Sequence, residues 1–74
     1  MYKDGFASKL KKARKDKQMN QIEVSVETGI PRGTLANYET GRTEPDIETL
    51  GILADFYNVS IDWLLGTKGG RKDK

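Results

Sequence analysis

The chain lacks the two side chains that most often do chemistry, because none of its 74 residues is cysteine or histidine. Without cysteine there is no disulfide and no thiolate nucleophile. Without histidine the commonest general base and metal ligand is missing. No phosphate-cradling glycine loop and no pair of carboxylates in a plausible cleft replaces them. We therefore expect no enzyme, no metal site and no cofactor.

Long apolar runs are also missing. No stretch approaches the roughly 20 apolar residues that span a bilayer, and no apolar segment follows Lys3, so we expect neither a membrane helix nor a signal peptide. The lack of cysteine fits a reducing cytoplasm. Strand-like alternation is not sustained anywhere, which predicts an all-α fold, and the short chain predicts one domain with a thin core.

The charge is small but unevenly distributed. The net charge is +2, yet residues 1–18 carry seven basic and two acidic groups, whereas residues 46–66 carry four acidic groups and no basic one. Such a polarised domain can steer a polyanion to one side. The lysines of the first helix can equally be an ordinary solvated face, and both interpretations stay open at this point.

Residues 20–42 contain the clearest pattern, two short helices joined by a tight turn. Asn20 and Glu23 have the spacing of a capping box, and Gly29 can close the first helix, predicted over 21–28. The second helix is predicted over 31–39, with Pro31 tolerated in its first turn. Two short helices meeting across a glycine turn make a helix-turn-helix.

The second helix has two different faces. Leu35 and Tyr38 lie on one face by their spacing. A guanidinium and a carboxamide on the other face suit the reading of base edges in a major groove. That outer face comprises Arg32, Gly33, Ala36 and Asn37.

Three further helices surround the motif and are predicted over 6–17, 46–57 and 61–65. In 6–17, Arg14 lies beside the apolar stripe, and a buried Arg needs a carboxylate partner. Asp46 and Ser60 are predicted N-caps. The apolar residues of 46–57 repeat at helical spacing and predict a wide core face. They are Ile47, Leu50, Leu53, Ala54 and Tyr57, widened by Ile52 and Phe56.

The ends of the domain are predicted from composition. The folded domain is expected over 1–66, with a frayed lead-in up to Gly5. The basic segment 67–74 has no apolar residue and is expected to be a disordered tail. The loop Thr40–Thr43 offers backbone donors, hydroxyls and a guanidinium, which suit a phosphate. It is also an ordinary helix-ending turn built on Gly41, and both can hold.

Residues 6–66 resemble the phage-repressor helix-turn-helix domain of the Cro and cI type, also called Xre. No single match is specific, but together they occur in order and at the right intervals. The matching residues are Leu10, Arg14, 19–21, Gly29, 34–39, Gly41, Arg42, Pro45, 46–50 and 59–66.

The resemblance implies a role for each matching residue. The second helix of the motif would lie in the major groove as a recognition helix. Arg14 and Glu39 would form a partly buried ion pair. Base-reading positions would be Arg32, Gly33, Thr34 and Asn37, although Gly33 has no side chain to contact a base. Phosphate-contacting positions would be Gln21, Asn20, Thr40, Gly41, Arg42 and Thr43. Pro31 stands where the family usually has a Ser or Thr cap.

The resemblance implies a bacterial or phage-encoded transcriptional regulator, a repressor by type, that binds double-stranded DNA. It would bind a palindromic site as a homodimer, with Tyr57 and Trp63 as the candidate dimer surface and no membrane involved. For Trp63 a place in the core is the other interpretation, and both stay open. The alternative is a protein-interaction module on the same fold, such as an antitoxin, in which Arg32 and Asn37 would not matter. The sequence identifies neither the operator nor a regulatory protein partner.

Overall fold

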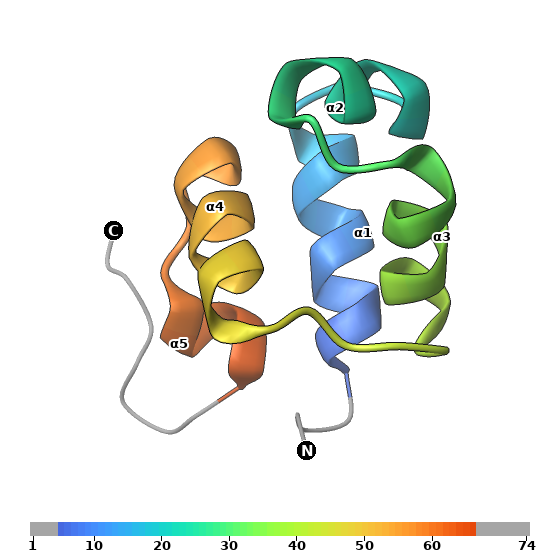
Figure 1. Ribbon diagram of the computed structural model, residues 1–74. Helices are drawn as coiled ribbons and strands as arrows, with labels where there is room; N and C mark the ends of the chain where they lie inside the picture. The colour runs from blue at the N-terminus through green and yellow to red at the C-terminus, as the bar shows by residue number, and fades with distance from the viewer. Residues whose placement is uncertain (1–4, 67–74) are drawn as a thin grey trace.

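Five α-helices follow one another along the chain in the computed structural model, which describes residues 5–66 (Figure 1). They are α1 (Phe6–Asp16), α2 (Gln21–Thr28), α3 (Arg32–Thr40), α4 (Ile47–Tyr57) and α5 (Ile61–Leu65). No strand occurs in the described part, so the predicted all-α fold is confirmed. The helix bounds differ from the predicted ones by no more than one residue. The predicted tail and most of the lead-in lie outside the described residues.

The predicted caps set where the helices begin. The Asn20 carboxamide oxygen accepts from the Glu23 N–H at 2.7 Å, and the Asn20 N–H donates to the Glu23 carboxylate at 2.8 Å, which is a complete capping box. Asp46 accepts from the Thr49 N–H at 2.8 Å, and this hydrogen bond lowers the pKa of the Asp46 carboxyl. Ser60 accepts from the Trp63 N–H at 2.9 Å. All three predicted N-caps are therefore confirmed.

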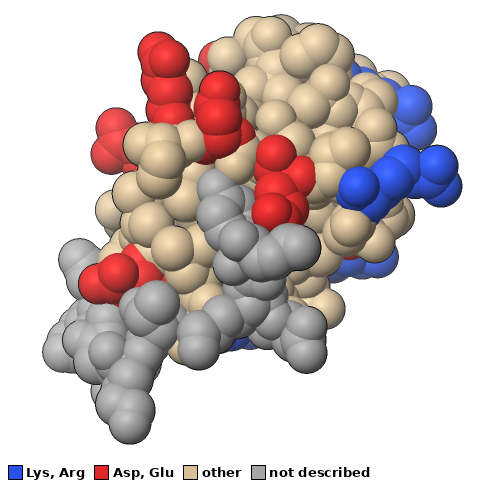
Figure 2. Space-filling model, turned by 60° about the horizontal axis from the view of Figure 1, so that its bottom comes forward, with Lys and Arg blue, Asp and Glu red and all other residues tan. Residues whose placement is uncertain are grey.

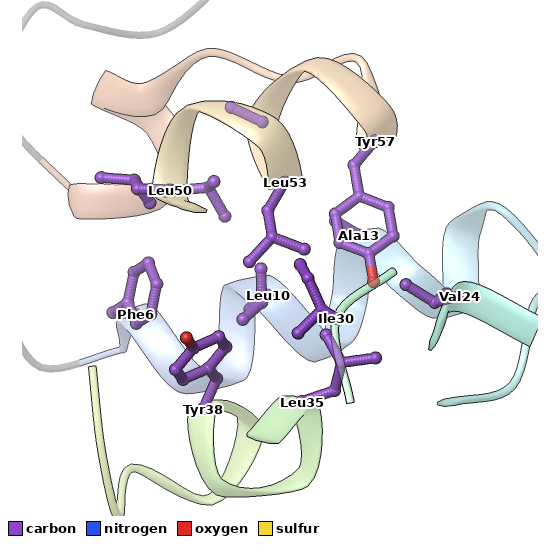
Figure 3. Close-up of a cluster of buried hydrophobic side chains, with 12 residues drawn as sticks. Phe6, Leu10, Ala13, Val24, Ile30, Leu35, Tyr38, Leu50, Leu53 and Tyr57 are labelled. Carbon is purple, nitrogen blue, oxygen red and sulfur yellow. The ribbon is translucent and has the colours of Figure 1, made fainter. Parts of the chain in front are cut away.

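Helix α1 is the centre of the packing. In Figure 1 it stands between α3 on one side and α4 on the other, with α2 across its upper end. Figure 3 shows the apolar side chains that meet along it. Six side chains in this core are fully buried, and each contributes about 1.5–3 kcal/mol by leaving water. They are Leu10, Val24, Leu35, Leu50, Leu53 and Leu64.

The core face of α4 is narrower than the sequence predicted. Leu50, Leu53, Ala54 and Tyr57 are buried, but Ile47 is 75% exposed and Ile52 is 44% exposed. The buried positions follow the i, i+3, i+4, i+7 stripe that faces the rest of the domain. Ile52 falls on the opposite side of that stripe, and Ile47 lies in the first turn with little packed over it. The prediction that Ile47 and Ile52 belong to the core was wrong.

Tyr57 lies on the core face of α4, as its helical spacing predicted, but a second prediction for this residue does not agree with its burial. It was predicted as part of a dimer surface, but its side chain is only 7% exposed, so it cannot supply one. Its ring reaches from α4 down toward α1 (Figure 3). The hydroxyl is buried without a hydrogen-bond partner among the described residues. Burial first, and then the charge of Glu39, raise the pKa of Tyr57 to about 12, against the opposing charge of Arg14.

Replacing Tyr57 with phenylalanine is expected to leave the free energy of unfolding at pH 7 unchanged, or to raise it by about 1 kcal/mol, since a buried, unpaired hydroxyl is removed. Above pH 10 an unfolded chain can ionise this Tyr while the folded chain cannot. The wild type should therefore lose about 1.4 kcal/mol per pH unit relative to the variant between pH 10 and 12. Urea denaturation of both proteins at pH 7, 10 and 11 checks this. A variant that is clearly less stable at pH 7 would mean that the hydroxyl is bonded.

The longest described helices, α1 and α4, have 11 residues each. None of the helices in residues 5–66 is long and apolar enough to cross a membrane.

Candidate nucleic-acid interface

Helices α2 and α3 are held together by buried side chains on both sides of the turn between them. Gly29 ends α2 with a φ of 80°, a left-handed conformation that costs glycine little. Val24 before the turn, Ile30 within it and Leu35 after it are all buried. The turn therefore fixes α3 across α2 and leaves the outer face of α3 to solvent.

A buried network of hydrogen bonds joins α1 to α2 and α3. The Arg14 Nε donates to Glu39 Oε2 at 2.8 Å and its Nη2 donates to Glu39 Oε1 at 2.9 Å, so the ion pair is bidentate. The side chains of Arg14 and Glu39 are only 10% and 2% exposed. The hydrogen bond to Glu39 is the main reason that the pKa of Arg14 is raised. The ion pair that the family resemblance implied is present in the structure.

Two further contacts extend this network toward the start of α2. Arg14 Nη1 donates to the Met19 carbonyl at 2.9 Å, which fixes the segment before α2. Gln21 Nε2 donates to Glu39 Oε1 at 3.1 Å. Gln21 therefore braces α3, while its own position at the start of α2 leaves it half-buried at the surface. The carboxylate of Glu39 therefore links α1, α2 and α3 and adds to the apolar packing that places α3 across α2.

An open concavity of about 330 Å³ lies beside this network. Two guanidinium groups and two carboxamides are gathered around it, together with one aliphatic side chain. The lining residues are Arg14, Asn20, Gln21, Ile22 and Arg32. The structure thus brings together Asn20 and Gln21, which were predicted to contact phosphate, and Arg32, which was predicted to read bases. Ile22 also lines the concavity, and nothing in the sequence pattern predicted that.

The outer face of α3 presents the other predicted base-reading residues. Arg32 and Gly33 are exposed in its first turn, and Thr34 and Asn37 are half-buried further along. Pro31 occupies the N-cap position with no side-chain cap, as its chemistry requires. A Cβ at Gly33 would have no heavy atom within 4 Å. The face is therefore small, open and polar, with Arg32 as its charged group.

The loop after α3 is first of all a helix-ending turn. Gly41 has a φ of 80°, and its N–H donates to the Tyr38 carbonyl at 3.3 Å. The N–H groups of Arg42 and Thr43 donate to the Asn37 carbonyl at 2.9 and 3.4 Å. The Thr40 hydroxyl donates to the same carbonyl at 3.2 Å. The backbone donors that the sequence offered to a phosphate are used within the turn, which leaves the exposed side chains of Arg42 and Thr43.

The lysines of α1 and its C-cap residue Lys17 do not make a single basic face. Lys9 lies over the Trp63 ring at 5.7 Å and Lys17 over the Phe56 ring at 5.1 Å. Lys12 pairs with Asp16 at 2.8 Å. The Lys and Arg side chains seen in Figure 2 lie mainly to the right, on the side of α3 in Figure 1, and the Asp and Glu side chains lie to the left and centre. The two signs of charge are therefore separated across this face of the molecule.

Trp63 is half-buried and packs against the core from α5, under the Lys9 ammonium. Within residues 5–66 no three acidic side chains come together as a metal site would require.

The five helices and the geometry of α2 and α3 define a helix-turn-helix domain. The chain belongs to the helix-turn-helix family HTH_3, whose model matches residues 10–64. The family resemblance read from the sequence is thereby confirmed.

Several bacterial proteins are similar to this chain. An uncharacterised HTH-type transcriptional regulator of Bacillus subtilis, YqaE, is 39% identical over 93% of this chain and 58% of its own length. The regulator ImmR of the same organism is 41% identical over 82% of this chain and 48% of its own. The transcriptional repressor RstR of the cryptic phage CTXphi in Vibrio cholerae is 39% identical over 76% of this chain and 50% of its own.

A solved structure also resembles this one. The crystal structure of a transcriptional regulator from Listeria innocua superposes with a TM-score of 0.76 at 30% identity, covering 93% of this chain and 64% of that one. The chain spans only about half to two thirds of the length of these relatives. These proteins are regulators by name, which agrees with the prediction of a non-enzyme.

Proposed function

We propose that this chain is a DNA-binding transcriptional regulator of the repressor type, which inserts α3 into the major groove of double-stranded DNA. One observation carries the proposal. Arg32, at the start of α3, lines the same concavity as Asn20 and Gln21, at the start of α2. The guanidinium that we propose reads bases and the two carboxamides that we propose bind phosphate therefore lie close together, and this supports the proposed role of the helix-turn-helix. The names of the similar proteins support the same function. A regulator of this kind acts in the bacterial cytoplasm, whether it is encoded by the chromosome or by a phage.

Direct base reading would rest mainly on Arg32 and Asn37, with Thr34 beside them. A bidentate Arg–guanine or Asn–adenine contact is worth roughly 1–3 kcal/mol of discrimination. Two such contacts in one half-site give limited specificity, since Gly33 adds none. We therefore propose a homodimer on a palindromic operator, with half-sites about one helical turn apart. With Tyr57 buried, the proposed dimer surface is left with Trp63 on α5.

The test is selection of bound sequences from a random duplex pool, followed by fluorescence anisotropy on the enriched sequence. Asn37→Ala is expected to relax preference at one base pair per half-site, at a cost of about 1–3 kcal/mol there. Gln21→Ala is expected to weaken binding to all sequences alike, because it loses a phosphate contact and the brace on Glu39.

The two variants serve as controls for each other, since one residue is on α3 and the other on α2. An enriched palindrome with these two signatures supports the proposal. Steep salt dependence without an enriched sequence would mean only non-specific attraction to phosphate. Absence of binding at low salt would overturn it.

A second candidate function is a protein-interaction module. The observation in its favour is the outer face of α4, where the exposed Ile52 lies beside Glu48 and Asp55. In that function Arg32 and Asn37 would have no role. If the experiment above finds no DNA binding at low salt, this second candidate becomes the favoured function.

A further inference from the structure

The exposed aliphatic side chains of α2 are the starting point. Ile22 is 59% exposed and Val26, one turn later, is 76% exposed. The two face the same side of the helix, since they are four residues apart. Only Ile22 is among the residues that line the concavity beside Arg14, Gln21 and Arg32. Two neighbouring aliphatic residues are thus in different surroundings.

The surroundings of Ile22 combine an apolar surface with groups that bind anions. The guanidinium of Arg14 has five N–H donors, and three of them are used by Glu39 and the Met19 carbonyl. The Asn20 oxygen is used by the capping box, which leaves its amide nitrogen. Arg32 lines the same concavity. An occupant that fits must carry a negative charge and apolar carbons close together.

A nucleotide of the DNA backbone has that composition. Its phosphate is an anion with several acceptor oxygens, and the deoxyribose bonded to it offers uncharged C–H surface. We infer that Ile22 packs against one deoxyribose of the bound strand, while the carboxamides of Asn20 and Gln21 beside it face the adjoining phosphate. Ile22 is then a positioning residue, which sets how deeply the start of α3 enters the groove. This inference rests on the proposed function and assigns a new residue to the same interface.

The inference predicts how DNA binding changes when Ile22 is truncated, in its strength, its sequence dependence and its salt dependence. Removing the outer carbons of Ile22 should weaken binding about fivefold, since each fully buried CH₂ is worth roughly fourfold and this contact is partial. The loss should be equal for every duplex sequence, because the sugar is the same at each base pair. The salt dependence should keep its slope, because no cation is removed and no counterion contact is lost.

The experiment is a fluorescence anisotropy titration of Ile22→Ala, Ile22→Leu and Val26→Ala against the selected duplex at four salt concentrations. Ile22→Ala should bind about fivefold more weakly with an unchanged salt slope. Ile22→Leu should restore most of the affinity. Val26→Ala, the matched control on the same helix, should bind like the wild type. Thermal melting of each variant shows that folding is retained, as expected for exposed positions.

Two outcomes would overturn the inference while leaving the proposed function intact. Equal affinity of Ile22→Ala and wild type would mean that the side chain does not touch the strand. A loss that disappears when one thymine is replaced by deoxyuridine would move the contact from the sugar to a thymine methyl. Failure of the wild type to bind any duplex would instead overturn the proposed function itself.

Discussion

Replacing Arg14 with alanine is expected to lower the free energy of unfolding by about 3–5 kcal/mol, the cost of breaking a buried pair from one side. The reason is that Glu39, whose side chain is 2% exposed, would keep a buried charge without its bidentate partner. A domain of this size has a small total stability, so much of the population would unfold at room temperature. Urea denaturation followed by far-ultraviolet circular dichroism measures the change.

A matched control comes from the same helix. Lys12→Ala breaks an ion pair with Asp16 in which both side chains are more than 60% exposed, and it should cost less than about 1 kcal/mol. The double variant Arg14→Met with Glu39→Leu removes both charges and should recover most of the stability lost in Arg14→Ala. A loss below about 1 kcal/mol in Arg14→Ala would show that water replaces the guanidinium, and that the pair is not buried in solution.

The second large effect is expected in α4, where two adjacent aliphatic residues have opposite surroundings. Leu53 is fully buried, and Leu53→Ala should lower the free energy of unfolding by about 2–5 kcal/mol through lost burial and a new cavity. Ile52 is 44% exposed, and Ile52→Ala should cost no more than about 1 kcal/mol. Thermal melting compares the two, since 1 kcal/mol shifts the Tm of a domain this small by about 4–8 °C.

Comparing the two variants tests which face of α4 packs against the core. Each change removes a few aliphatic carbons from a neighbouring position, so helix propensity and loss of side-chain volume are nearly matched. Similar melting temperatures for Leu53→Ala and Ile52→Ala would mean that α4 presents another face to the core.

The ends of the helices were readable from the sequence because they depend on local chemistry. A capping side chain bonds an N–H only two or three residues away, so Asn20, Asp46 and Ser60 could be assigned from spacing alone. The same holds for Gly29 and Gly41, where the chain needs a left-handed conformation. Such features require no knowledge of what the rest of the chain does.

The face that each helix turns inward was harder to predict, because it depends on neighbours that are distant in sequence. Helix α4 has apolar residues on most sides, so its periodicity could not exclude Ile47 and Ile52 from the core. The partner of Arg14 lies 25 residues away, and charge alone could not select Glu39 among the acids of the chain. Only the family resemblance supplied that partner. The sequence did not mark Ile22 as a residue of the interface, since an aliphatic side chain in a short helix is usually buried.

Gly33 has a consequence for how such a protein can change over generations. It lies exposed in the first turn of α3, its backbone is one that any residue adopts, and no heavy atom within 4 Å would meet an added Cβ. Glycine inside a helix is less favourable than alanine by about 1 kcal/mol. Almost any side chain could therefore replace it without loss of stability, and it would point from the outer face of α3. Under the proposed function, Gly33 is thus an unoccupied position on α3 through which a single codon change would alter the preference among DNA sequences.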